Sequence, residues 1–222
     1  AEQQTSFQQS QNLYHREASR LESLKNITER YDGYGNSIRR VMSQKSRYQG
    51  LFGVVADLIK TDKIYELAVE TALGGSIQNI VTDTEETAKQ MIAYLKQNKY
   101  GRATFLPLNA MRRGGGIARP EALREAGVIG TADILVKTEE KYLNLVENLL
   151  GRTIVVQNID FGIAIARKYH QTLRIVTLEG ELINPGGAIA GGAYKNSSNL
   201  LSRRREIEEA EKQVVSLKEQ ME

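Results

Sequence analysis

Residues 50–74 read GLFGVVADLIKTDKIYELAVETALG, and residues 127–151 read GVIGTADILVKTEEKYLNLVENLLG. Glycine, tyrosine and aliphatic residues recur in the same order at an offset of 77 positions: Gly50 and Gly127, Gly53 and Gly130, Leu58 and Leu135, Tyr65 and Tyr142, Val69 and Val146, Leu73 and Leu150, Gly74 and Gly151. The same offset pairs Ile77 with Ile154 and Asp83 with Asp160, and a shift of one more residue pairs Pro107 with Pro185. This repetition predicts two related subdomains that arose by internal duplication.

Each repeat alternates strand-like and helical patterns. Residues 51–59, 77–82 and 103–108 are strand-like, whereas residues 63–73 and 85–96 have helical spacing. Such alternation is typical of a mixed α/β or α+β fold. We therefore expect subdomains at residues 49–111 and 126–195, separated by a Gly- and Arg-rich connector at residues 112–125 that should be mobile.

Helical arms are expected on both sides of this pair. In residues 196–222, apolar or small side chains recur at spacings of three and four, at Ile207, Ala210, Val214, Leu217 and Met221. In residues 1–48, Phe7, Tyr14, Leu21 and Thr28 recur every seven positions. These patterns predict an antiparallel coiled coil, although the last segment alone would also suit an ordinary amphipathic helix.

Composition excludes several kinds of chemistry. The 222 residues contain no Cys and only two His, which excludes disulfides, thiolate metal sites and Cys nucleophiles. Neither a membrane span nor a signal peptide is recognisable, and the absence of an initial Met suggests a piece of a longer chain. We expect no enzyme activity, catalytic residue, metal or cofactor.

The segment PGGAIAGGAY at residues 185–194 lacks the Lys and Ser or Thr of a phosphate-binding loop, and it does not fit the dinucleotide pattern. Its row of small residues instead permits close approach of another backbone. That element could belong to the same chain, as in a tight turn, or to a second subunit. Ala72–Gly75 forms a smaller segment of the same kind.

Basic residues concentrate where the arms meet the domain. Residues 33–60 carry a net charge of +4 and residues 196–205 carry +3, against −4 for residues 206–222 and +3 overall. These clusters could be solvated helix faces, or they could bind phosphates without sequence preference. The candidate DNA-binding residues are Arg39, Arg40, Lys45, Arg47, Lys195, Arg203, Arg204 and Arg205.

The combination of arms, a duplicated domain, the GRATFLP stretch at residues 101–107 and the late glycine motif resembles the hinge of a structural maintenance of chromosomes (SMC) protein of the bacterial type. The resemblance implies a homodimer whose contact includes Gly186, Gly187, Gly191, Gly192, Gly74 and Gly75. It also implies weak DNA binding, a parent ATPase that organises chromosomes in the cytoplasm on the nucleoid, and kleisin and accessory subunits only at distant head domains.

Two other hypotheses remain open from the residues themselves. A stand-alone nucleic-acid-binding protein with a helical hairpin would depend on the arginines more than on the glycines. A nucleotide-binding enzyme would need a phosphate loop that the sequence lacks.

Overall fold

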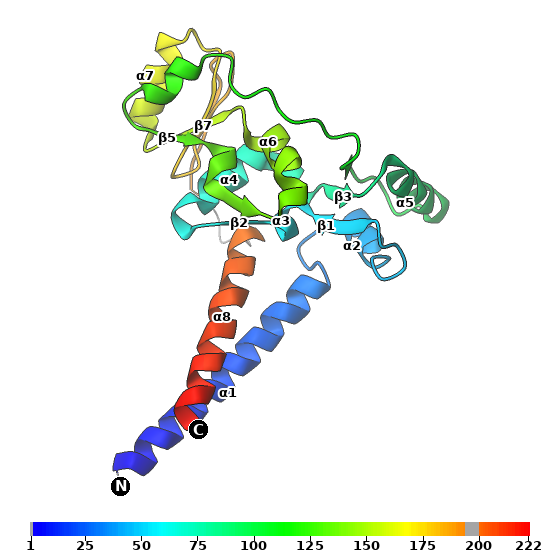
Figure 1. Ribbon diagram of the computed structural model, residues 1–222, viewed down its shortest axis with the longest axis vertical. Helices are drawn as coiled ribbons and strands as arrows, with labels where there is room; N and C mark the ends of the chain where they lie inside the picture. Colours follow the sequence, from blue (N-terminus) through cyan, green and yellow to red (C-terminus); the bar gives the residue numbers. More distant parts are fainter. Residues whose placement is uncertain (1, 194–199) are drawn as a thin grey trace.

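The computed structural model describes residues 2–193 and 200–222 (Figure 1). Two long helices, α1 (Glu2–Glu29) and α8 (Leu200–Met221), extend from one side of a domain that contains both helices and sheets. The predicted mixed fold is therefore confirmed. Within the described residues, no helix has both the length and the apolar character needed to cross a membrane.

The two arms run in opposite directions and contact each other. Lys25 Nζ lies 3.3 Å from Glu211 Oε1, and the seam side chains Ala210 and Leu217 are buried. The predicted seam of α8 is thus the face that packs on α1. Phe7 is the exception in α1: its side chain is 48% exposed, because this end of α1 extends past the end of α8 (Figure 1).

The first unit of the domain contains a three-stranded sheet in the order β1-β3-β4. A short helix α2 (Asn36–Met42) leads into it. Its elements follow as β1 (Leu51–Val54), α3 (Val55–Leu58), β2 (Ile59–Thr61), η1 (Lys63–Tyr65), α4 (Glu66–Leu73), η2 (Gly74–Gln78), β3 (Ile80–Thr82), α5 (Glu85–Asn98) and β4 (Phe105–Pro107).

The second unit contains a five-stranded sheet in the order β10-β9-β8-β7-β5. Its elements are η3 (Pro120–Arg124), β5 (Val128–Thr131), η4 (Ala132–Leu135), β6 (Val136–Thr138), η5 (Glu140–Tyr142), α6 (Leu143–Leu150), β7 (Thr153–Val156), α7 (Ile159–Lys168), β8 (Arg174–Thr177), β9 (Leu182–Ile183) and β10 (Ile189–Ala190).

The two units share their order of elements. Every element from β1 to α4 has a counterpart of equal length from β5 to α6, at the same offset of 77 positions. Gly53 and Gly130 occupy the same irregular position of the β1–β3 and β5–β7 pairings, with φ of +142° and +156°. A residue with a side chain rarely adopts such φ values, so glycine recurs at this position of both repeats.

The offset changes after these helices, because η2 has no counterpart in the second unit. Val54 pairs with Ile80, and the equivalent Thr131 pairs with Ile154, so the offset falls to 74. The predicted pairs Ile77–Ile154 and Asp83–Asp160 are therefore wrong. Thr84 and Asn158 are the equivalent residues, and each side chain accepts a hydrogen bond at the N-terminus of the following helix.

The proline pairing is wrong as well. Pro107 ends β4, which runs parallel to β3, and its counterpart in β8 is Thr177. Pro185 instead follows β9, which is an addition to the second unit.

The two units share one of two core clusters, and the other cluster belongs to the second unit. Strands β2 and β6 pair antiparallel, with Lys60 opposite Lys137, and one cluster of buried side chains contains residues of both units. The connector also contacts the second unit, because Arg113 Nε donates to Glu147 Oε2 at 2.7 Å and Asn148 Nδ2 donates to the Arg112 carbonyl at 2.9 Å. These contacts restrain the part of the connector for which mobility was expected.

Candidate functional site

Two surfaces contain the residues that the sequence singled out. The first, the glycine face, consists of residues 74–75 and 186–192. At its edge, strand β10 pairs with β9 alone among the described strands, so its other edge has no strand partner. Ile189 of β10 is 55% exposed, which places a large apolar side chain at this edge. An unpaired strand edge with apolar side chains is suited to association with another chain.

Packing inside the chain does not require most of these glycines to be small. A Cβ atom at Gly74, Gly75, Gly186 or Gly192 would have no heavy atom within 4 Å, and one at Gly187 would only make ordinary contacts. Gly191 is the exception, because a Cβ there would lie 2.9 Å from Glu181 Cγ, and the Glu181 carboxylate accepts a hydrogen bond from the Thr177 hydroxyl. The backbone accounts for some of them, because Gly186, Gly187 and Gly192 have positive φ. Gly75 has neither a close neighbour nor a positive φ.

The structure brings α4, which ends directly before Gly74, close to the second glycine segment. The Thr71 hydroxyl of α4 donates to the Gly180 carbonyl at 3.3 Å. A groove of about 300 Å³ is lined by Thr71 on one side and by Gly180, Leu182 and residues 190–193 on the other. Segments more than 100 positions apart in the sequence therefore form one surface.

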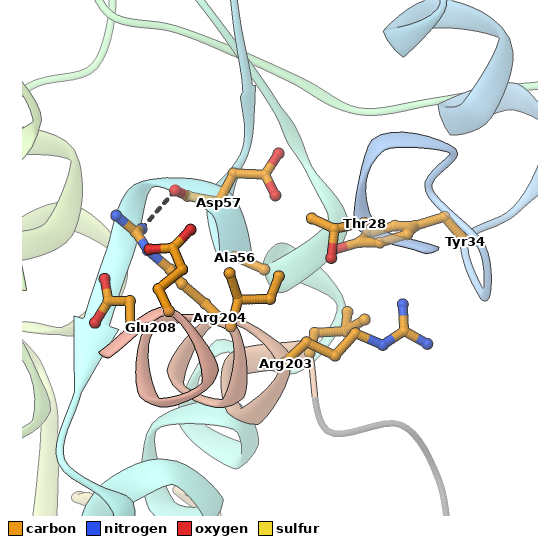
Figure 2. Close-up of a pocket in the computed structure, with 10 residues that line it drawn as sticks. Thr28, Tyr34, Ala56, Asp57, Arg203, Arg204 and Glu208 are labelled. Atoms are coloured by element: carbon orange, nitrogen blue, oxygen red, sulfur yellow. Dashed lines mark hydrogen bonds between the residues drawn. The ribbon is translucent and has the colours of Figure 1, made fainter. Parts of the chain in front are cut away.

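The second surface is the arm junction, where α1 and α8 meet the first unit (Figure 2). It surrounds a cavity of about 320 Å³ that is lined by Thr28, Tyr34, Ala56, Asp57, Leu200, Arg203, Arg204, Ile207, Glu208 and Glu211. Asp57 lies at its centre: Asp57 Oδ2 accepts hydrogen bonds from the Tyr31 hydroxyl at 2.7 Å and from the Val54 amide at 3.1 Å. The carboxylate thus joins the incoming arm to β1.

Burial dominates the electrostatics of this site. It raises the pKa of Asp57, whereas the bonds from Tyr31 and Val54 and the nearby charges of Lys45 and Arg204 lower it. The pKa values of Tyr31 and Tyr34 are also raised, first by burial and then by the charge of Asp57. Both phenols therefore remain protonated at neutral pH, and Tyr31 can serve as a donor.

Sequence reasoning missed Asp57 and the two tyrosines. A signal was present, since the repeat places Ile134 at the position of Asp57. Ile134 is 68% exposed, whereas Asp57 is covered by the arms. This departure from the repeat marks the residue that only the first unit uses to hold an arm.

The arginine triplet makes contacts within the chain. Arg203 Nη1 donates to the Asp32 carbonyl at 2.6 Å, and Arg204 Nη1 donates to the carbonyls of Ile59 at 3.0 Å and of Asp57 (Figure 2). Arg205 pairs with the buried carboxylate of Glu66, and its Nη1 also lies 3.0 Å from Glu209 Oε1. These contacts attach the outgoing arm to the domain.

The other basic cluster faces solvent. Arg39, Arg40, Lys45 and Arg47 are all exposed, and the Arg40 guanidinium lies 4.6 Å from the centre of the Tyr100 ring. Lys45 is close enough to Asp57 to lower its pKa, as is Arg204, so both clusters reach the junction. Lys195 lies outside the described residues.

No catalytic arrangement emerges among the described residues. His15 lies on the exposed surface of α1 beside Tyr14, and His170 is exposed after α7. In the part of the chain that the structure describes, no three His, Asp or Glu residues gather in a way that could hold a metal ion.

Comparison with known proteins points to one family. Residues 48–166 match the family described as "SMC proteins Flexible Hinge Domain". The chromosome partition protein Smc of Desulfitobacterium hafniense is 42% identical over 199 residues, and that of Bacillus subtilis is 38% identical over 204 residues. These alignments cover 87% and 90% of the chain but only 17% of each relative.

A solved structure of similar shape is a crystal structure described as an asymmetric dimer of the SMC hinge domain of Geobacillus stearothermophilus. It matches with a TM-score of 0.90 and 34% identity, over 98% of this chain and 89% of that one. The SMC hinge domain of Pyrococcus furiosus matches with a TM-score of 0.59 and 30% identity, over 83% and 96% of the two chains.

Proposed function

The chain belongs to the SMC flexible hinge family, and from this premise we propose that it is a dimerisation hinge that joins two copies of itself through the glycine face. The observation that carries the proposal is the glycine face itself: exposed glycines beside a strand, β10, whose outer edge pairs with no other described strand. The Geobacillus relative of very similar fold is a dimer, which supports the same assignment.

A two-fold dimer would use this surface on both copies. In such an arrangement the same residues contribute from each subunit, and each contact occurs twice. Two backbones can approach closely only where no side chains intervene, which accounts for glycine at position 75, where neither φ nor a neighbour within the chain requires it. The opposite directions of the arms then let each copy fold back on itself, with both arms leaving the hinge from one side (Figure 1).

Gly75→Leu tests the proposal. Because the monomer has open space and an ordinary backbone at Gly75, the variant should fold normally, yet its side chain would project into the dimer contact. Gly35→Leu is the matched control, since Gly35 also has no neighbour within 4 Å of a Cβ but lies at the start of α2. Light scattering after gel filtration should give a dimer for the wild type and Gly35→Leu, and a weakened dimer for Gly75→Leu. A wild-type monomer would refute the function, and a stable Gly75→Leu dimer would refute the assignment of Gly75.

DNA binding is the second part of the proposal. Arg39, Arg40, Lys45 and Arg47 are exposed and make no ion pair among those of the described residues, so their charges are available to phosphates. The arginines at 203–205 remain candidates, but a phosphate would compete there with the contacts that hold α8. Lys195 completes the proposed set.

The matching experiment is charge reversal. Arg39→Glu with Arg47→Glu should weaken binding to duplex DNA uniformly across sequences and flatten the dependence of affinity on salt concentration. Glu85→Lys with Glu86→Lys, at the start of α5, changes the net charge in the opposite sense as a control. Unchanged DNA affinity in the arginine variant would remove this role. If DNA binding survives loss of the dimer, the alternative of an independent nucleic-acid-binding protein with a helical hairpin would be favoured.

For the whole protein, we propose a chromosome-partitioning ATPase of the nucleoid whose head domains lie at the far ends of the arms. Kleisin and accessory subunits would bind at those heads rather than at the hinge. The relatives named chromosome partition protein Smc support this assignment, and the chain spans about a sixth of their length.

A further inference from the structure

Arg174, the first residue of β8, connects the two units next to the glycine face. Its Nη1 donates to the Ala72 carbonyl at 2.9 Å and to the Thr153 hydroxyl at 2.8 Å. Thr153 lies beside it in the sheet of the second unit, whereas Ala72 belongs to the last turn of α4 in the first unit. One half-buried guanidinium therefore fixes the end of α4 to the sheet of the other unit.

The negative end of α4 is the main described partner of this charge. Among the ion pairs of residues 2–193 and 200–222, none includes Arg174. The last carbonyl groups of a helix carry partial negative charge and lack partners within the helix, so a cation that donates to them is favourable. Burial lowers the pKa of Arg174, but a guanidinium remains charged at any physiological pH.

The contact between Arg174 and Ala72 holds the first of the two segments of the glycine face, residues 74–75. Directly after Ala72 and Leu73 the chain enters η2 through Gly74, whose φ is +54°. Gly75 follows, exposed and without a neighbour at its Cβ position. On the other side, β8 leads through Gly180 and β9 to Ala190, Gly191 and Gly192. Arg174 thus attaches the helix that leads to the first segment to the sheet that contains the second.

Comparison of the two repeats shows that the contact between Arg174 and the end of α4 has no counterpart at the end of α6 among the described residues. Helix α6 is separated from β7 by two residues, with no counterpart of η2. In the first unit, Thr104 occupies the position equivalent to Arg174, since Pro107 corresponds to Thr177. The long cation is therefore present only where the added turn with the glycine pair must be held.

We propose that Arg174 is a positioning residue for the dimer contact, which holds Gly74 and Gly75 in place relative to Ala190, Gly191 and Gly192. This inference rests on the proposed function. Its physical basis is preorganisation: a surface already fixed in the free monomer loses less conformational entropy when the partner binds. Thr71, which donates to the Gly180 carbonyl, supports the same alignment one residue earlier in α4.

Arg174→Met tests the proposal, because methionine keeps much of the apolar stem and removes the donors. Arg174→Lys restores one donor and should rescue in part. Arg113→Met is the matched control: it also removes an arginine contact between distant segments, to Glu147, but on the connector. The dimer dissociation constant is measured by sedimentation equilibrium, and amide hydrogen exchange of residues 73–79 is measured under the same conditions.

The expected result is a dissociation constant raised about tenfold for each contact affected, which corresponds to about 1.4 kcal/mol. A two-fold dimer with two such contacts should show about a hundredfold change. Exchange should accelerate at residues 73–79 and not in the buried strand β7. Arg113→Met should leave the dissociation constant within a factor of about two to three, and Arg174→Lys should fall between Arg174→Met and the wild type.

The outcomes separate this inference from the function on which it rests. A wild-type dimer that Arg174→Met leaves unchanged would overturn the role of Arg174 and keep the hinge assignment. Equal weakening by Arg174→Met and Arg113→Met would also overturn it, because general destabilisation would then explain both. A monomeric wild type would remove the dimer, and the inference would fall with it.

Discussion

The bond between Tyr31 and Asp57 gives the most detailed prediction for the arm junction. Tyr31→Phe removes the hydroxyl that donates to Asp57 Oδ2 at 2.7 Å and leaves the ring in its edge contact with Tyr34. The carboxylate keeps only the Val54 amide as a described donor. A hydrogen bond to a charged group contributes about 1.5–3 kcal/mol, so the variant should lose about 2 kcal/mol in its free energy of unfolding.

The decrease in the free energy of unfolding that Tyr31→Phe causes should depend on pH. Burial raises the pKa of Asp57 in the folded state above its unfolded value of about 3.9. A group with a raised folded pKa contributes stability that is present in full below the unfolded pKa and is lost as pH rises through the folded pKa. The hydrogen bond from Tyr31 reduces the stability that is lost when Asp57 ionises, because it favours the ionised carboxylate. The deficit of Tyr31→Phe should therefore be largest at neutral pH and shrink in acid, where Asp57 is protonated.

Urea denaturation at fixed protein concentration, repeated between about pH 4 and pH 8, measures this deficit. Asp57→Asn supplies the control, because it removes the ionisation and keeps a polar group of similar shape. In that background Tyr31→Phe should cost only about 0.5–1.5 kcal/mol, with no dependence on pH in this range. A deficit that is the same at every pH, or the same in the Asp57→Asn background, would refute the assigned charge-assisted bond.

Three further predictions concern the domain itself, each measured as the free energy of unfolding in urea. Gly127→Ala should destabilise by roughly 2–3 kcal/mol, because its Cβ would lie 2.2 Å from Phe161 Cγ at a φ of +85°; a loss below about 0.5 kcal/mol would show that the ring moves away easily. Arg205→Met should cost about 3–5 kcal/mol by leaving the buried Glu66 carboxylate without its partner, and adding Glu66→Leu should recover most of it; no recovery would mean that the arginine acts through packing. Ile134→Asp should change stability by less than about 0.5 kcal/mol, because this side chain is 68% exposed; a large loss would indicate that it is covered in the dimer.

Much of the fold could be predicted because the repeat consists of residues with strong conformational or burial preferences, such as glycine and aliphatic residues. Gly53 and Gly130 mark equivalent irregular positions, and the elements that follow each of them, up to α4 and α6, have the same spacing. The register of the later strands could not be predicted by the same offset. Three extra residues around η2, the difference between offsets of 77 and 74, shift it. An insertion without its own pattern is invisible when only residue identities are aligned.

The candidate sites were predictable to different degrees. The glycine segments stand out in the sequence, yet only the fold reveals that Thr71 contacts Gly180 and shares a groove with residues 190–193. Asp57 escaped notice because burial by two helical arms, rather than its neighbours in sequence, gives it a role. Arg204 could be recognised as a charge, but its contact with the Ile59 carbonyl depends on how α8 returns to the domain.

Hydrogen exchange of the wild-type chain, compared with Gly75→Leu at the same concentration, tests the central claim most directly. If two copies meet through the glycine face, amides at residues 74–76 and 186–192 should be protected in a species of twice the chain mass of 24.8 kDa, and this protection should be lost in the variant. Protection elsewhere in the domain, or identical exchange in the two proteins, would contradict the account.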